Sequence, residues 1–142
     1  MAPFPAPIAP LPAYVCAVIE DDRRRLLLEL RPAQERHAAN LLTCFGGARE
    51  NDETMDAALR RELREELDWT LGASTPCCDL RGHDGRWIAR FFRCPWRPAP
   101  LRTEPGVVPI WAPWSAMPAL PLSPWHGVVL LAMLDGRTEA VV

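Results

Sequence analysis

The sequence contains no lysine, and all sixteen of its basic residues are arginine. Its formal net charge is −2, so it lacks the basic excess of a protein that coats nucleic acid or an anionic membrane. No apolar run is long enough for a membrane-spanning helix, and the Pro- and Ala-rich residues 1–12 do not resemble a signal peptide. We therefore expect a cytoplasmic protein with no membrane partner and no stable nucleic-acid partner.

Cysteine is present, but not in the pattern of a disulfide framework. The five cysteines are an odd number, and the adjacent pair Cys77-Cys78 does not have the spacing of metal ligands. Free cysteine usually behaves as a small apolar residue, so we expect inert thiols in a reducing compartment. A zinc site formed by Cys44, Cys94 and a histidine is left as an alternative.

The length of 142 residues suits a single domain over residues 1–142, with residues 1–12 as a Pro-rich leader. Apolar patterning predicts a helix over 53–67 and a closing helix over 128–134. Irregular structure is expected over the proline-rich residues 112–124. Strands around one long helix indicate a mixed α/β fold with the helix packed on a sheet. The strands are expected at residues 14–20, 25–31, 41–45, 69–71, 78–80, 87–94 and 107–111.

The predicted central helix carries three carboxylates on one face. At about 100° per residue, Glu66 falls about 40° to one side of Glu62, and Glu65 about 60° to the other. Like charges one turn apart repel by about 0.2–0.5 kcal/mol per pair, and a bound divalent cation reverses that repulsion. The alternative is a solvated face with local ion pairs. Arg61 has the right spacing to pair with Glu65, whereas Glu62 and Glu66 have no cationic neighbour one turn away.

The residues before this helix complete a longer pattern. The chain reads Gly47, five residues, Glu53, seven residues, Arg61-Glu62-Leu63, one residue, and Glu65-Glu66. This spacing resembles the box of the Nudix (MutT-like) hydrolase family. The resemblance implies a Nudix-type α/β/α sandwich, with a mixed β-sheet and the catalytic helix packed on it. It also implies a Mg²⁺-dependent pyrophosphohydrolase that cleaves a diphosphate linkage in a nucleoside diphosphate joined to some group X, by water attack on phosphorus.

The resemblance also assigns roles to individual residues. It makes Glu65 the first candidate for the base that activates water, and Glu104, which precedes a late strand, the second. Mn²⁺ is the expected substitute for Mg²⁺. The implied metal ligands are Glu62, Glu65, Glu66 and the backbone of Gly46, and the implied structural support of the site is Gly47, Glu53 and Arg61.

The substrate is less closely defined. A (deoxy)nucleoside triphosphate or an oxidised nucleotide is the first expectation, with ADP-ribose, a nucleotide sugar or a dinucleoside polyphosphate as alternatives. A second class of function is a catalytically inactive Nudix-fold sensor or interaction domain that binds a nucleotide. The intact set of carboxylates argues against that class. A homodimer is compatible with the sequence.

Two positions depart from the family pattern. Asp68 replaces a glycine that follows the helix, where a left-handed cap is expected, at a cost of about 1 kcal/mol. Phe45 replaces a proline, which leaves open an aromatic ring near the substrate. We expect Trp87, Phe91 and Phe92 to serve mainly in core packing. The three histidines, His37, His83 and His126, receive no role.

Overall fold

The computed structural model describes residue 4 and residues 10–142, so most of the expected leader over residues 1–12 lies outside the described part. No helix within the described part is long and apolar enough to cross a membrane. The elements, in chain order, are β1 (Tyr14–Glu20), β2 (Arg25–Leu30), β3 (Leu42–Thr43), β4 (Phe45–Ala48), α1 (Met55–Leu67), β5 (Thr75–Arg81), β6 (Trp87–Pro95), β7 (Val108–Pro113), the 3₁₀ helix η1 (Trp114–Ala119), α2 (Pro124–Leu134) and β8 (Glu139–Val141).

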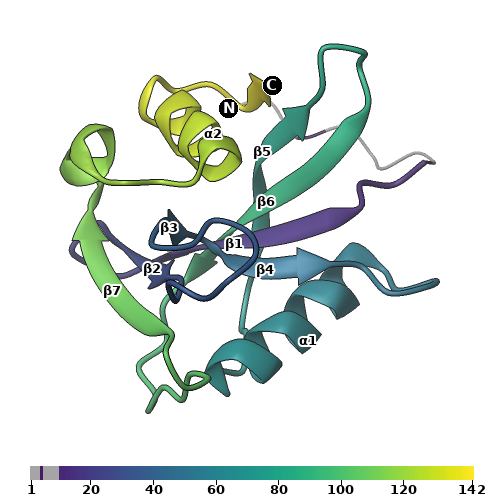
Figure 1. Ribbon diagram of the computed structural model, residues 1–142. Helices are drawn as coiled ribbons and strands as arrows, with labels where there is room; N and C mark the ends of the chain where they lie inside the picture. The colour runs from purple at the N-terminus through teal and green to yellow at the C-terminus, as the bar shows by residue number, and fades with distance from the viewer. Residues whose placement is uncertain (1–3, 5–9) are drawn as a thin grey trace.

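The strands form one mixed sheet in the order β3-β2-β1-β6-β5-β8, with β4 paired to β1 and β7 paired to β2. Strands β1 and β6 run parallel, whereas β1 and β4 run antiparallel with Cys16 opposite Gly46. Strand β4 runs alongside α1 (Figure 1), so its glycine pair lies against Glu62 and Glu66 in the later turns of the helix.

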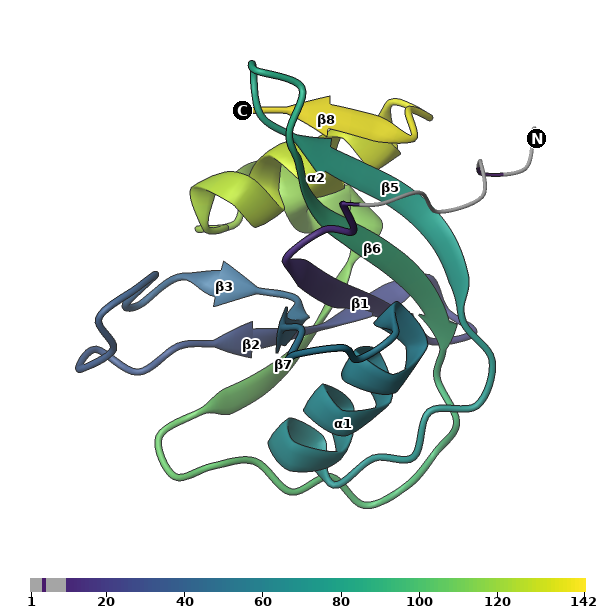
Figure 2. The same ribbon diagram turned by 90° about the vertical axis from the view of Figure 1, so that its right-hand side faces the viewer.

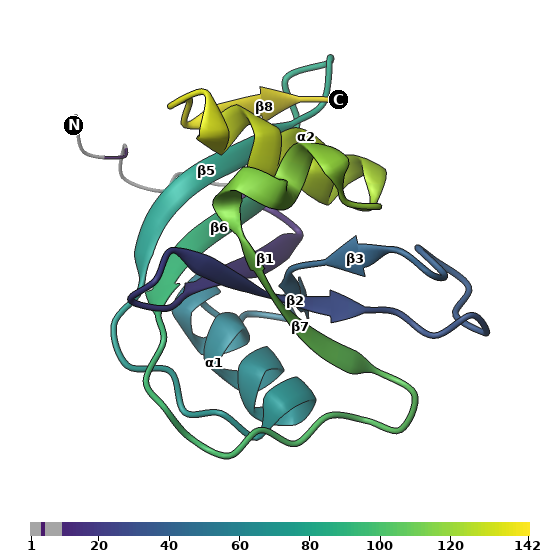
Figure 3. The ribbon, with the colours of Figure 1, turned by 90° about the vertical axis from the view of Figure 1, so that its left-hand side faces the viewer.

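The two helices cover opposite faces of the sheet, α1 on one side and α2 on the other (Figures 1, 2 and 3). Strand β1 shows why. Its residues Val15 and Ala17 pack in the core cluster under α1, while the alternate residues Cys16 and Val18 pack in the cluster under α2. The prediction of an α/β/α sandwich with the central helix packed on a mixed sheet is therefore confirmed.

Helix α1 begins and ends at residues that satisfy its backbone. Thr54 is the N-cap residue: its hydroxyl accepts a hydrogen bond from the N–H of Ala57 at 3.1 Å, and the helix begins at Met55. Asp68 takes the left-handed conformation (φ 53°, ψ 38°), and its N–H donates to the carbonyl of Arg64. The inner face is an apolar stripe of Met55, Ala58, Leu59, Leu63 and Leu67.

Several expected elements differ from the structure. Residues 69–71 form no strand, because Trp69 leaves the helix directly into the core, where its ring stacks on Trp96 with centroids 5.2 Å apart. Residues 114–119 form a 3₁₀ helix rather than irregular chain, and Pro118 lies inside it. Helix α2 begins at Pro124, earlier than expected, because proline is well suited to the first helical position. The sequence reading did not predict strand β8.

Candidate active site

The Gly46-Gly47 backbone lies directly against the acidic face of α1. Gly46 has φ +144°, and a Cβ there would lie 2.2 Å from the carbonyl oxygen of Val15. A Cβ on Gly47 would lie 2.6 Å from Oε1 of Glu62. The first position thus requires glycine for the backbone to pass, and the second requires it for the carboxylate to approach.

Glu66 is the more enclosed of the two inward carboxylates. It accepts a hydrogen bond from the N–H of Gly46 at 3.0 Å. Burial, together with the charges of Glu29 and Glu62, raises the pKa of Glu66 to about 9. Burial also raises the pKa of Glu62, although Arg61 opposes that shift. The raised pKa values of Glu62 and Glu66 show that positively charged groups of the protein compensate their negative charge only in part.

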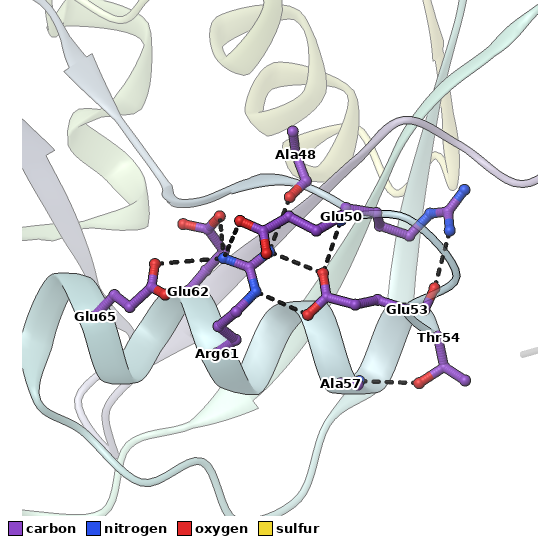
Figure 4. Close-up of polar contacts among 9 residues, drawn as sticks. Ala48, Glu50, Glu53, Thr54, Ala57, Arg61, Glu62 and Glu65 are labelled. Carbon is purple, nitrogen blue, oxygen red and sulfur yellow. Dashed lines mark hydrogen bonds and ion pairs between the residues drawn. The ribbon is translucent and has the colours of Figure 1, made fainter.

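Arg61 joins the helix to the loop before it (Figure 4). Its guanidinium binds both carboxylate oxygens of Glu53, at 2.8 and 2.9 Å, and the carbonyl of Ala48 at 3.1 Å. This fork lowers the pKa of Glu53 to about 2. The same guanidinium reaches Glu62 at 3.1 Å and Glu65 at 3.3 Å. Arg61 therefore fixes the loop to α1 and sets the positions of two further carboxylates.

The remaining two candidates lie farther out. The side chain of Glu65 is 59% exposed and turns toward Arg61. Glu104 is exposed in the loop before β7, and its charge acts on Glu29. The structure thus brings together Gly46, Gly47, Glu62 and Glu66, with Glu53 and Arg61 behind them, and leaves Glu65 and Glu104 at the margin.

A cavity of about 530 Å³ opens beside the glycine pair. It lies between β1, β2, β6 and the start of α2, and its wall includes both Gly46 and Gly47. A ligand in this space would therefore touch the backbone that contacts the carboxylates. The other described lining residues are Tyr14, Cys16, Glu29, Arg31, His37, Ala38, Thr43, Cys44, Leu80, Ala89, Phe91, Ser123, Pro124, Trp125 and His126.

His126, to which the sequence reading gave no role, is one of these lining residues. Its Nδ1 accepts a hydrogen bond from the N–H of Cys44 at 3.0 Å, and its ring and that of Phe91 pack edge to face with centroids 5.3 Å apart. Burial lowers the pKa of His126 to about 4, so the ring is neutral near pH 7. The proton of the neutral ring then lies on Nε2, which makes that atom a hydrogen-bond donor.

Ser123, next to this histidine in the cavity wall, was also missed. It occupies the N-cap position of α2 but makes no side-chain capping hydrogen bond. Its Oγ is buried and has no partner within the described residues. Buried hydroxyl groups normally have partners, so this one is available to a ligand. In the sequence, a serine before Pro124 indicates an ordinary helix cap. The sequence therefore does not reveal that the hydroxyl group has no partner.

Glu29 is the third functional candidate that the sequence reading missed. It is 4% exposed and lines the cavity, and its charge helps to raise the pKa of Glu66. Arg31 donates to its Oε1 at 2.9 Å. A signal was present, since Glu29 is the one charged residue between the apolar positions of β2. A buried carboxylate in an apolar strand needs a partner or a function.

Phe45 does not place an aromatic ring near the cavity. It is fully buried in the cluster under α1, whereas the preceding residue, Cys44, packs in the cluster on the other face of the sheet. Phe91 lines the cavity and also packs in the core, whereas Phe92 belongs to the cluster under α1. Cys44 and Cys94 lie in different core clusters, so a shared zinc ion is excluded.

The donor set fits a hard divalent cation. The inward groups are carboxylate and backbone oxygens, and Gly47 leaves room for the carboxylate of Glu62 where any side chain would fill it. Within the described residues, no three acidic, histidine or cysteine side chains already surround one point closely enough to hold a metal ion. Glu65 would have to turn away from Arg61 to join Glu62 and Glu66.

The chain belongs to the Nudix family, since a sequence profile described as NUDIX domain matches residues 10–133. A search of curated proteins gives no match. Among solved structures, the ORF135 protein of E. coli is 33% identical over 86% of this chain and 87% of its own, with a TM-score of 0.66.

Two further solved structures share the fold at lower identity. The MutT protein of Methanosarcina mazei Go1 is 18% identical over 87% of this chain and 92% of its own, with a TM-score of 0.71. The NUDIX domain of Shewanella oneidensis NrtR, complexed with ADP ribose, is 19% identical over 86% of this chain and 82% of its own, with a TM-score of 0.64. These two likenesses bear on the fold alone.

Proposed function

We propose that this protein is a Mg²⁺-dependent hydrolase that cleaves a diphosphate linkage in a nucleoside diphosphate joined to a group X. One observation carries the proposal: the Gly46-Gly47 backbone touches Glu62 and Glu66 beside a cavity of about 530 Å³. Oxygen donors beside a substrate-sized cavity suit a cation that bridges protein and phosphate. Membership of the Nudix family supports the same class of reaction.

In this proposal Glu62, Glu65, Glu66 and the carbonyl of Gly46 hold Mg²⁺, for which Mn²⁺ can substitute. The bound ion supplies charge neutralisation at the phosphate oxygens and a lowered pKa for the attacking water. Arg61 acts as a positioning residue, because its fork to Glu53 fixes the loop that carries the glycines.

Proton transfer from the attacking water is assigned to a glutamate. Glu65 is the first choice, since it lies on the acidic face of α1 and is free to move, with a side chain that is 59% exposed. To act, it leaves the guanidinium of Arg61. Glu104 is the second choice, because it reaches the site electrostatically from the loop before β7.

For the substrate, we propose a (deoxy)nucleoside triphosphate, ordinary or oxidised, with its nucleoside in the cavity. His126 offers a neutral N–H donor and Ser123 an unpartnered hydroxyl to the edge of a base. Trp125, 46% exposed, offers a ring for stacking. Arg31, the one arginine among the described lining residues, already donates to Glu29, Glu35 and the carbonyl of His37. Such a wall favours an uncharged ring over a second phosphate group.

A second candidate is a Nudix-fold sensor that binds a nucleotide without cleaving it. The NUDIX domain of NrtR, which shares this fold, was solved with ADP ribose. ADP-ribose or a nucleotide sugar could therefore occupy the cavity under either function. The complete set of carboxylates at Glu62, Glu65 and Glu66 favours the hydrolase.

The test is a substrate panel. Phosphate release is measured with nucleoside triphosphates, oxidised nucleotides, nucleotide sugars, dinucleoside polyphosphates and ADP-ribose, with coupled pyrophosphatase and phosphatase, in Mg²⁺ and in EDTA. The proposal predicts Mg²⁺-dependent turnover, fastest with a nucleoside triphosphate. Binding of a nucleotide without turnover of any compound would replace the hydrolase with the sensor.

A further inference from the structure

Glu29 is an acidic side chain that the protein buries without fully pairing. The described part of the chain has two buried carboxylates, Glu29 and Asp79. Both oxygens of Asp79 bind the guanidinium of Arg90, at 2.8 and 2.9 Å. Glu29 instead shares Arg31 with the carboxylate of Glu35 and the carbonyl of His37. Its charge is therefore compensated only in part.

A second acidic side chain that Glu29 acts on is Glu66. Glu29 projects from β2 into the same cavity wall as Gly46, and the N–H of Gly46 donates a hydrogen bond of 3.0 Å to Glu66 on α1. The charge of Glu29 helps to raise the pKa of Glu66. Two ionised carboxylates that act on each other across one site repel each other unless a proton or a cation lies between them. Beside a site proposed for a divalent cation, the cation can take the proton's place.

We propose that Glu29 is a further carboxylate of the metal site, presented from the sheet opposite Glu66. This inference rests on the proposed function. The family pattern over residues 47–66 does not contain Glu29, so the sheet adds an acidic group to the set on the helix. Arg31 holds Oε1 of Glu29 at 2.9 Å and thereby fixes the direction of the carboxyl group.

A purely structural role for Glu29 would be to hold Arg31, which in turn organises residues 32–41. The chain offers a matched control for this alternative. Glu35 also pairs with Arg31, at 3.0 Å through Nη2, but its side chain is 42% exposed and does not line the cavity. Loss of either carboxylate removes one ion pair from Arg31, whereas only loss of Glu29 removes the group that faces Glu66.

The experiment is a Mn²⁺ titration of the substrate-free protein, followed by the electron paramagnetic resonance signal of free Mn²⁺. Wild type, Glu29→Gln and Glu35→Gln are compared. We expect Glu29→Gln to weaken Mn²⁺ binding about tenfold or more, and Glu35→Gln to leave it within about twofold. Thermal unfolding in EDTA checks that each variant is folded, and the rise in Tm on adding Mn²⁺ should shrink in Glu29→Gln alone.

Three results would overturn the inference. Unchanged Mn²⁺ affinity in Glu29→Gln removes Glu29 from the metal site. Equal losses in Glu29→Gln and Glu35→Gln assign the effect to Arg31. A higher KM with intact Mn²⁺ binding makes Glu29 a substrate contact instead. If Glu29→Gln does not fold, Glu29→Asp takes its place, and unchanged Mn²⁺ binding by that shorter carboxylate counts against the inference.

The wild type separates this inference from the function on which it rests. If wild type binds Mn²⁺ and turns over a substrate while Glu29→Gln matches it, only the role of Glu29 fails. If wild type neither binds Mn²⁺ nor cleaves any compound of the panel, the proposed function fails and the role of Glu29 fails with it.

Discussion

The N–H of Gly46 donates a hydrogen bond of 3.0 Å to the carboxylate of Glu66, which joins strand β4 to the fourth turn of α1. The next residue, Gly47, is so close to Glu62 that a Cβ there would lie 2.6 Å from a carboxylate oxygen. The glycine pair and the acidic face of the helix therefore form one unit. We therefore expect substitutions at Gly46 or Gly47 to alter the positions of the Glu62 and Glu66 carboxylates.

The first prediction separates the two glycines. In Gly47→Ala the new methyl group meets the end of the flexible Glu62 side chain, so we expect Glu62 to move aside while the fold survives. Mn²⁺ affinity should fall about 10- to 100-fold. In Gly46→Ala the methyl group meets the backbone of Val15 at 2.2 Å, at φ +144°, so stability itself should fall by more than about 1 kcal/mol.

Mn²⁺ titration and urea unfolding of the two variants test this contrast. A Gly47→Ala protein with normal Mn²⁺ binding would show that Glu62 does not take part in holding the metal. A Gly46→Ala protein as stable as wild type would contradict the required close approach to Val15.

The second prediction concerns Arg61. Arg61→Lys keeps the charge but cannot bind both oxygens of Glu53 and the carbonyl of Ala48 together. We expect kcat to fall about 10- to 100-fold with little change in KM, since the loss is in positioning. Steady-state kinetics check this, with Arg64→Lys, on an exposed side of α1, as the matched control. A large rise in KM with unchanged kcat would instead indicate direct substrate binding by Arg61.

The third prediction concerns pH and His126. Burial lowers the pKa of His126 to about 4, whereas the unfolded chain binds the proton near pH 6.5. Stability contributed by the neutral ring is therefore complete above about pH 6.5 and is lost as pH falls toward 4, by up to about 3 kcal/mol.

Urea unfolding of wild type and His126→Gln between pH 7.5 and 4.5 isolates this contribution. The difference in unfolding free energy between the two proteins should shift in favour of the variant as pH falls. A difference that stays constant with pH would mean that the ring titrates alike in the folded and unfolded states.

The fourth prediction uses the left-handed cap of α1. Asp68 has φ 53° and ψ 38° and is exposed, so Asp68→Gly relieves backbone strain without removing a core contact. We expect stabilisation of up to about 1 kcal/mol and a Tm higher by about 2–4 °C. Calorimetry tests it, and a lower Tm would show that the aspartate stabilises the cap through its side chain.

The sequence was sufficient to predict the α1 side of the molecule. The apolar period of residues 53–67 and the spacing from Gly47 to Glu66 predict a helix, its acidic face and its packing on a sheet. The left-handed cap at Asp68 was expected from the resemblance to the Nudix box, which has glycine at this position. These features depend on local spacing, which a single sequence contains.

The cavity could not be predicted in the same way, because its wall comes from distant segments. Glu29, Cys44 and His126 meet only when β2, the chain before β4 and α2 close around one space. At residues 69–71 the sequence predicted a strand that does not form. Their apolar character reflects packing of Trp69 in the core, not pairing in the sheet. Tertiary packing decides both cases.

The most direct test of the central claim is turnover by Glu66→Gln, with Glu139→Gln at an exposed position of β8 as the control. Both are assayed in Mg²⁺ on the substrate that wild type cleaves fastest, and nucleotide binding is measured separately by calorimetry. The account predicts a loss of kcat of about 10³-fold or more in Glu66→Gln, with nucleotide still bound, and no loss in the control. Wild-type turnover by Glu66→Gln would contradict the assignment of this helix as the metal-binding catalytic element.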